Sequence, residues 1–247
     1  MLKYQLGTFD DAGKSLQFRL HVPKTTPDSD PNIPVMIWLH GVKGRGNDNL
    51  KQMLGPNGFG PAYFVSDEVQ EAFPMIVVVP QCPQGKFWIN FRNNSPKKSL
   101  TRVINLLKAL SEDQPIDLTR IYIGGQSMGG FATWAAISEH PKMFAAAIPV
   151  AGGGSPRKAR KYIKTPVWAF HGVNDPLVGV GRSREMVEAL KKAEKPVEYT
   201  EYALGKHDIW GSVFEEDGFL PWLQKQVGPS KKKKVIKQTR PLRFLGL

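Results

Sequence analysis

Five short apolar runs restrict the fold of this chain more than any other feature. They cover residues 33–41, 73–81, 116–127, 144–154 and 165–175. Such a run is typical of a strand in a parallel sheet, because helices cover both faces of that sheet and leave neither side of the strand in water. We therefore expect a mostly parallel sheet at the centre of the molecule.

Helical patterns separate these runs. They lie at residues 99–113, 127–141, 183–196 and, with an interruption, 210–226. In the first of them apolar residues recur three and four positions apart, from Leu100 to Leu107. Two further segments, 14–23 and 196–204, alternate apolar and polar residues, which predicts half-exposed strands, the second nearer an edge. The order of strands and helices predicts an α/β fold with a doubly wound, mostly parallel sheet and helices on both faces.

Charge separates the end of the chain from the rest. The protein has 247 residues and a formal net charge of +12. Five lysines and two arginines, with no acidic residue, lie in residues 231–247, and without these seven charges the remainder carries +5. We predict one domain over residues 1–228 and a basic, flexible tail over 229–247. A contact of the tail with nucleic acid or an anionic surface is not favoured, because terminal lysine runs are usually solvated.

The sequence also bears on location. No apolar stretch reaches the roughly 18 residues of a transmembrane helix, so we expect no stable membrane insertion. Residues 1–18 lack the apolar core of a secretory signal peptide and contain two aspartates. Cys82 is the single cysteine and leaves no intrachain disulfide. These features predict a cytoplasmic protein.

A serine between glycines ends the third apolar run. Ser127 follows a predicted strand and precedes an alanine-rich helix, with Gly125 and Gly129 two residues to either side. A strand-to-helix turn this tight forces its central residue into an unfavourable backbone conformation, and larger flanking side chains would collide. The pattern is the nucleophile elbow, G-x-S-x-G. The pentapeptide alone is weak evidence, but its position between strand and helix makes Ser127 the candidate nucleophile.

A serine hydroxyl needs a base, which is usually a histidine oriented by a carboxylate. If the acid follows the serine and the histidine follows the acid, His207 is the one histidine of five that fits. Asp175 ends the fifth apolar run, at the carboxyl end of a strand, where parallel sheets form their sites. Its alternative role is a turn before Pro176, and Asp208 is a less favoured acid. The sequence predicts a triad of Ser127, His207 and Asp175.

The tetrahedral intermediate of acyl transfer needs backbone N–H groups that already point at its negative oxygen. Met128, directly after the serine, offers one at a helix N-terminus. Val42 can offer the second, because His40 and Gly41 reverse the chain after the first apolar run. A phosphate-binding loop is the alternative, but this loop lacks the spacing of both common phosphate motifs. Val42 and Met128 are therefore the candidate oxyanion hole.

With these residues placed, the chain resembles the α/β-hydrolase superfamily. It is most similar to its esterase and peptidase-like branch, described as phospholipase/carboxylesterase, polyhydroxybutyrate depolymerase-like or prolyl oligopeptidase-type. The resemblance rests on IWLHGVKGRGNDN, VVPQCPQGKFW, IYIGGQSMGGFATWAAISEHPKMFAAAIPVAGGG, PVWAFHGVNDPLV and GKHDIW. These stretches span about residues 33–225, and their combination is specific although each alone is not.

The resemblance implies the α/β-hydrolase fold, the triad and oxyanion hole named above, no cofactor, no metal and hydrolysis of a small-molecule ester. In such folds Trp88 and Trp210 fall near the mouth of the site, where they could line a substrate pocket, and core packing is the equal alternative. No long insertion follows residue 154. We therefore expect no large lid domain and an open site.

Three functions stay open at this point. The first is a serine esterase that works through an acyl-enzyme. The second is a peptidase or amidase of the prolyl oligopeptidase type, although such enzymes usually add a propeller domain and 247 residues leave no room for one. The third is a binding protein whose four consecutive lysines contact phosphates or anionic lipid. The complete set of triad residues disfavours a pure binding role, and the esterase is the preferred function.

Overall fold

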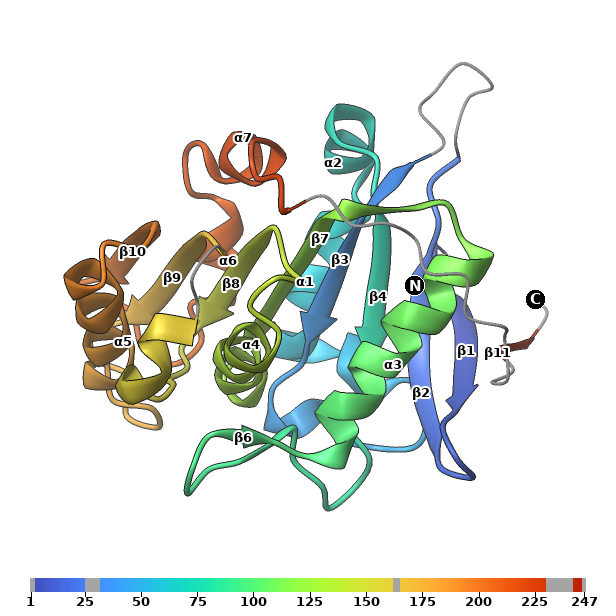
Figure 1. Cartoon of the computed structure of the whole chain (residues 1–247), viewed down its shortest axis with the longest axis horizontal. Coiled ribbons are helices and arrows are strands. Elements are labelled where there is room, and N and C mark those ends of the chain that lie inside the picture. Colours follow the sequence, from blue (N-terminus) through green and yellow to red (C-terminus); the bar gives the residue numbers. More distant parts are fainter. Residues whose placement is uncertain (1–2, 25–31, 162–164, 230–241, 246–247) are drawn as a thin grey trace.

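The computed structural model describes residues 3–24, 32–161, 165–229 and 242–245. Within them, one sheet of nine strands has the order β10–β9–β8–β7–β3–β4–β2–β1–β11 (Figure 1). The strands are β1 (Gln5–Asp10), β2 (Ser15–His21), β3 (Ile33–Leu39), β4 (Ile76–Pro80), β7 (Ile116–Gln126), β8 (Ala146–Val150), β9 (Val167–Gly172), β10 (Val197–Tyr202) and β11 (Leu242–Leu245). A separate two-stranded ribbon joins β5 (Ile89–Asn90) to β6 (Ser95–Pro96).

The predicted parallel sheet is confirmed. From β4 through β3, β7, β8 and β9 to β10 all neighbouring strands run parallel, whereas β2, β1 and β11 join antiparallel. The five apolar runs became β3, β4, β7, β8 and β9, and every residue of β3, β4, β8 and β9 is buried. β10 lies at the edge and is only half-buried, as its alternating pattern predicted.

Helices cover both faces of the sheet. One face carries α3 (Lys98–Asp113), α4 (Met128–Glu139) and α5 (Gly181–Lys192), and the other carries α1 (Phe59–Phe64), α2 (Asp67–Ala72), α6 (Trp210–Phe214) and α7 (Phe219–Gln224). Two separate apolar clusters follow from this arrangement, one on each side of the strands. The doubly wound architecture is therefore confirmed.

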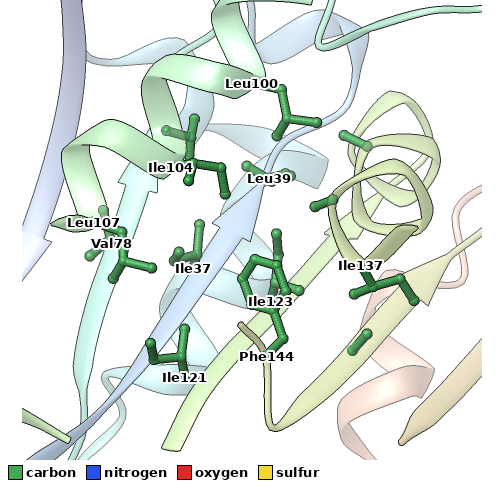
Figure 2. Packing of buried hydrophobic residues seen from close by; sticks show 14 of the residues in the cluster. Ile37, Leu39, Val78, Leu100, Ile104, Leu107, Ile121, Ile123, Ile137 and Phe144 are labelled. Atoms are coloured by element: carbon green, nitrogen blue, oxygen red, sulfur yellow. The ribbon is translucent and has the colours of Figure 1, made fainter. Parts of the chain in front are cut away.

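The cluster beneath α3 shows why the helix lies where it does. Figure 2 shows Leu100, Ile104 and Leu107 of α3 over the strand residues Ile37 and Val78. The three leucine and isoleucine side chains repeat at helical spacing, so one stripe of α3 meets the sheet and the opposite side meets water. The apolar periodicity that predicted the helix thus also determines which side of α3 packs against the sheet.

The connection from β8 to β9 is short. It spans residues 151–166, and its described part contains a single 3-10 helix, Pro156–Lys161. A segment of this length cannot form a lid domain, and the open site stays a prediction. No helix among the described residues has both the length and the apolar character needed to cross a membrane.

The end of the chain departs in part from the predicted flexible tail. Residues 242–245 form β11, which pairs antiparallel with β1, and the ring of Phe244 meets that of Phe18 at 5.9 Å between centroids. The lysine run at 231–234 lies outside the described residues. A paired strand therefore replaces the flexible segment over these four residues, and the domain boundary after residue 228 stays a prediction.

The central position of Ile123 in β7 leads to a stability prediction. The side chain is fully buried between α3 and α4 in the larger cluster. We expect Ile123→Ala to lower the free energy of unfolding by about 2–5 kcal/mol, because it leaves a cavity that rigid neighbours cannot fill. The matched variant Ile123→Val should cost only about 0.5–1.5 kcal/mol. Urea denaturation of both variants checks this, and equal losses would contradict the packing described.

Candidate active site

Ser127 lies in the turn between β7 and α4. Its backbone has φ 54° and ψ −118°, a conformation that L-residues rarely adopt. Such strain persists only where the surroundings hold it, and it lifts the side chain clear of the neighbouring backbone. The predicted elbow geometry is therefore present at this serine.

The two flanking glycines explain how the elbow is held. A Cβ atom on Gly129 would lie 1.9 Å from the carbonyl oxygen of Leu39, and one on Gly125 would lie 2.5 Å from the same atom. The end of β3 therefore presses directly against the turn. No side chain fits at either position, which is the steric reason for the G-x-S-x-G pattern.

The three predicted triad residues meet at the carboxyl edge of the sheet. His207 Nε2 lies 2.9 Å from Ser127 Oγ, and His207 Nδ1 lies 2.6 Å from Asp175 Oδ2. Ser127 follows β7, Asp175 follows β9 and His207 follows β10. A proton on Nδ1 donates to the carboxylate and leaves Nε2 free to accept the serine proton.

Asp175 makes the contacts that each of its two predicted roles requires. Its Oδ1 accepts hydrogen bonds from the N–H groups of Leu177 and Val178, each at 2.8 Å. These bonds form the predicted turn that Asp175 begins and that contains Pro176. Its Oδ2 faces His207. Burial would raise the pKa of the Asp175 carboxyl, but the hydrogen bonds from Val178, His207 and Leu177 outweigh it and lower that pKa. The carboxylate is thus ionised and held in one orientation.

A second histidine, His171, lies behind the acid, and the sequence analysis assigned it no role. Its Nε2 lies 2.7 Å from Val178 O and 3.3 Å from Asp175 Oδ2, and its Nδ1 lies 2.7 Å from Ser183 Oγ. Burial lowers the pKa of His171, so the ring is neutral and its Nε2–H donates to the carbonyl. The His-Gly pair at residues 171–172, within the fifth apolar run, was the sequence feature that could have indicated this role.

His40 fixes the loop that carries Val42. Its Nδ1 donates to Gly41 O at 2.6 Å, and its Nε2 accepts the Cys82 N–H at 2.9 Å. The indole N–H of Trp88 donates to His40 O at 3.3 Å. Burial lowers the pKa of His40 to about 4, because a proton on Nε2 would have neither water nor a free acceptor. The neutral ring thus joins its own loop to the segment that holds Cys82, and the backbone carbonyl of the same residue binds Trp88.

The predicted oxyanion-hole residues adjoin the serine. A Cβ atom on Gly41 would lie 3.5 Å from Ser127 Cβ, so the loop and the elbow are in contact. Val42 begins the 3-10 helix Val42–Gly44 and Met128 begins α4. The first N–H groups of a helix have no partner within it and are available to a ligand. Their role as an oxyanion hole stays a prediction.

Trp88 and Trp210 are both buried, with 0% and 4% of their surface exposed. The Trp88 ring packs 5.2 Å from that of His40, and the Trp210 ring packs edge-on 5.2 Å from that of His207. Both indoles are thus packed in the interior, as the alternative reading of these tryptophans expected. Each of them contacts the imidazole ring of one histidine. Their contact with a substrate stays a prediction.

Three exposed apolar side chains lie on loops at the same sheet edge as the triad, and the sequence analysis considered only Val42 among them. Val42 follows Gly41, Leu177 lies two residues after Asp175, and Leu204 lies three residues before His207, and they are 41%, 74% and 91% exposed. Their loops all leave the carboxyl edge of the sheet. We call these three residues the apolar rim. Among the described residues, no three His, Cys, Asp or Glu side chains gather as metal ligands do.

Comparison with known proteins assigns this constellation to a family. The model of the family described as phospholipase/carboxylesterase matches residues 21–217. The chain belongs to the phospholipase/carboxylesterase family. This is a family of esterase-type hydrolases with the α/β-hydrolase fold. The resemblance to that superfamily, which the sequence motifs suggested, is therefore confirmed.

Individual relatives agree with this assignment. The crystal structure of a thermostable esterase is 35% identical with a TM-score of 0.84, over 91% of this chain and 63% of that one. A bifunctional acetylxylan esterase/xylanase of Neocallimastix patriciarum is 24% identical, over 60% of this chain and 20% of its own length. Poly(3-hydroxyalkanoate) depolymerase C of Paucimonas lemoignei is 27% identical, over 60% and 34%. The chain thus spans less than two thirds of each of these relatives.

The contact between the elbow and β3 leads to a first prediction. In Gly129→Ala the new methyl group would meet the backbone of Leu39. We expect the free energy of unfolding to fall by about 3 kcal/mol, the upper end of the usual range for overpacking, because rigid backbone cannot move aside. Gly179→Ala is the control, since an added Cβ there meets no atom within 4 Å, and it should change stability by less than about 1 kcal/mol. Similar values for both variants, measured by urea denaturation, would contradict the described contact.

Burial of His40 leads to a prediction for pH. Its folded-state pKa of about 4 lies below the ordinary 6.5, so the unfolded chain binds this proton first as pH falls. The contribution of the neutral His40 ring to the free energy of unfolding is fully present above pH 6.5. Acidification towards pH 4 removes about 3 kcal/mol of it. His40→Gln should therefore flatten the pH dependence of the unfolding free energy in this window. An unchanged slope in urea titrations would show that the imidazole is not held neutral.

Proposed function

We propose that this protein is a serine esterase that cleaves carboxylic esters through an acyl-enzyme. The observation that carries the proposal is the continuous pair of contacts from Ser127 Oγ to His207 Nε2 and from His207 Nδ1 to Asp175 Oδ2, at 2.9 and 2.6 Å. Such a chain makes a hydroxyl nucleophilic, because the imidazole takes its proton while the carboxylate stabilises the resulting imidazolium. Membership of an esterase-type family supports the same assignment.

In the first half-reaction Ser127 Oγ attacks the acyl carbon while its proton passes to His207 Nε2. The carbonyl oxygen becomes negative, and the N–H groups of Met128 and Val42 donate to it. The intermediate then collapses with cleavage of the bond to the alcohol oxygen, which leaves with the proton held by His207. The products of this step are a free alcohol and an ester between the acyl group and Ser127.

The second half-reaction repeats these transfers with water. His207 Nε2 accepts a proton from a water molecule, whose oxygen attacks the acyl carbon. Collapse of the second intermediate breaks the bond to Ser127 Oγ, which takes back the proton, and the carboxylic acid is released. Asp175 stays ionised throughout, as its lowered pKa requires.

The surroundings of the triad favour small or extended esters. The connection between β8 and β9 has no room for a lid domain, and the apolar rim offers exposed aliphatic surface on loops at the same edge of the sheet. Apolar surface of this kind gains free energy by covering the hydrocarbon part of an acyl group. The relatives named for acetylxylan and poly(3-hydroxyalkanoate) support an ester of a small acid.

Hydrolysis of short p-nitrophenyl esters tests the proposal. We expect Ser127→Ala to reduce kcat/KM by roughly 10³-fold or more, because nothing replaces the nucleophile. A fluorophosphonate should label the native protein at Ser127 and leave the variant unlabelled. Ser111→Ala, on the surface of α3, is the control and should keep full activity.

The same assay separates esters from amides. A matched anilide of the same acyl group should be cleaved much more slowly, because an amine leaves less readily than an alcohol. Equal hydrolysis of esters by the native protein and Ser127→Ala would reject the proposed nucleophile. Faster cleavage of the anilide would instead assign the triad to a peptidase or amidase.

A further inference from the structure

A cavity of about 620 Å³ lies outside the triad, between the start of α3, the β1–β2 turn and the loop that precedes β5. Its size is that of an ordinary small-ligand site. Five of its lining residues are cationic: Lys14, Lys86, Lys97, Lys98 and Arg102. We call this the basic cavity.

Charge in the basic cavity is not balanced by the protein. No acidic residue is among those that line it. None of its five cationic side chains forms an ion pair within the described part of the chain. Cations gathered around one hollow focus a positive potential into it, since the protein wall has a low dielectric constant. The cavity therefore attracts negative charge more strongly than a scattered set of surface lysines would.

Arg102 differs from the other four cations, because it is partly buried whereas the lysines are exposed. Its Nε has no hydrogen-bond partner among the described residues. A charged donor that has lost water and gained no acceptor costs free energy. A negative charge in the adjoining cavity would offset part of this cost by Coulomb attraction, without contact with Nε itself.

The walls of the basic cavity are held in place before any ligand binds. Ser99 Oγ donates to Phe87 O at 2.5 Å, which joins α3 to the preceding loop. The guanidinium of Arg45 lies 4.8 Å from the centre of the Phe87 ring, and Lys97 Nζ lies 5.7 Å from it. These contacts fix the Phe87 wall of the cavity, and a wall that does not rearrange lowers the free-energy cost of binding.

We propose that the basic cavity binds a ligand with two or more negative charges, carried by phosphate or carboxylate groups. Five cations provide more positive charge than one monovalent anion can neutralise. A second cavity, between α1 and α7, shows the contrast, because Glu68, Glu215, Glu216 and Asp217 line it. The anion preference thus belongs to one place in the fold and not to the net charge alone.

Titration of the full-length protein with inorganic pyrophosphate tests this proposal. Isothermal calorimetry at constant ionic strength should show saturable binding with a stoichiometry near one, and the Tm should rise with pyrophosphate concentration. Sodium chloride at equal ionic strength should produce neither effect. Absence of saturable binding by the native protein would overturn the proposal.

Matched charge variants decide where the anion binds. Lys97→Gln combined with Arg102→Gln should weaken pyrophosphate binding at least tenfold, while its circular dichroism and anion-free Tm show that it folds. The control combines Lys142→Gln with Lys225→Gln, two exposed lysines outside the cavity, and removes the same charge. Equal weakening in both double variants would reduce the effect to net charge and overturn the site.

Kinetics distinguish two sources of the anion, in an arm that rests on the proposed esterase activity. If the charged group belongs to the substrate, pyrophosphate should compete with an ester that carries a phosphate group and not with its neutral analogue. If the ligand is a separate anion, pyrophosphate should leave the KM of both esters unchanged. The calorimetric result stands in either case, and it stands also if no ester is cleaved.

Discussion

The contact between the nucleophile turn and the end of β3 is the constraint on which the site depends. The carbonyl of Leu39 occupies the space where side chains of residues 125 and 129 would lie. This close approach positions Ser127 and the start of α4 relative to the loop after β3 in one step. The proposed nucleophile and both proposed oxyanion donors are thus parts of a single packing arrangement, and none of them relies on a flexible side chain for its position.

Two neutral histidines extend this rigidity outwards. His40 joins the loop after β3 to the segment after β4, and His171 braces the turn that carries Asp175. Each replaces water as a hydrogen-bond partner of backbone groups that would otherwise be buried without one. The strand ends are therefore linked to one another by imidazole rings, and of the three imidazoles at this edge His207 is the one that is not fully buried.

Features that depend on local sequence patterns could be predicted, whereas features that depend on contacts between distant residues could not. Strand burial, the α/β order and the residues of the triad follow from local spacing and chain order, and the structure brings Ser127, His207 and Asp175 together as expected. The bracing role of His171 could not be seen, because its partners are set by a turn and by α5. β11 escaped prediction because its basic, proline-containing segment has no strand pattern, and pairing with β1 decides its conformation.

The pairing of β1 with β11 has a consequence for folding. The two strands lie far apart in the sequence, at residues 5–10 and 242–245, so closing this pair costs more loop entropy than joining β1 to its neighbour β2. Until the pair closes, β1 presents an open strand edge, which is a template for pairing with other polypeptides. Protection of this side of the sheet therefore depends on a contact of long sequence separation.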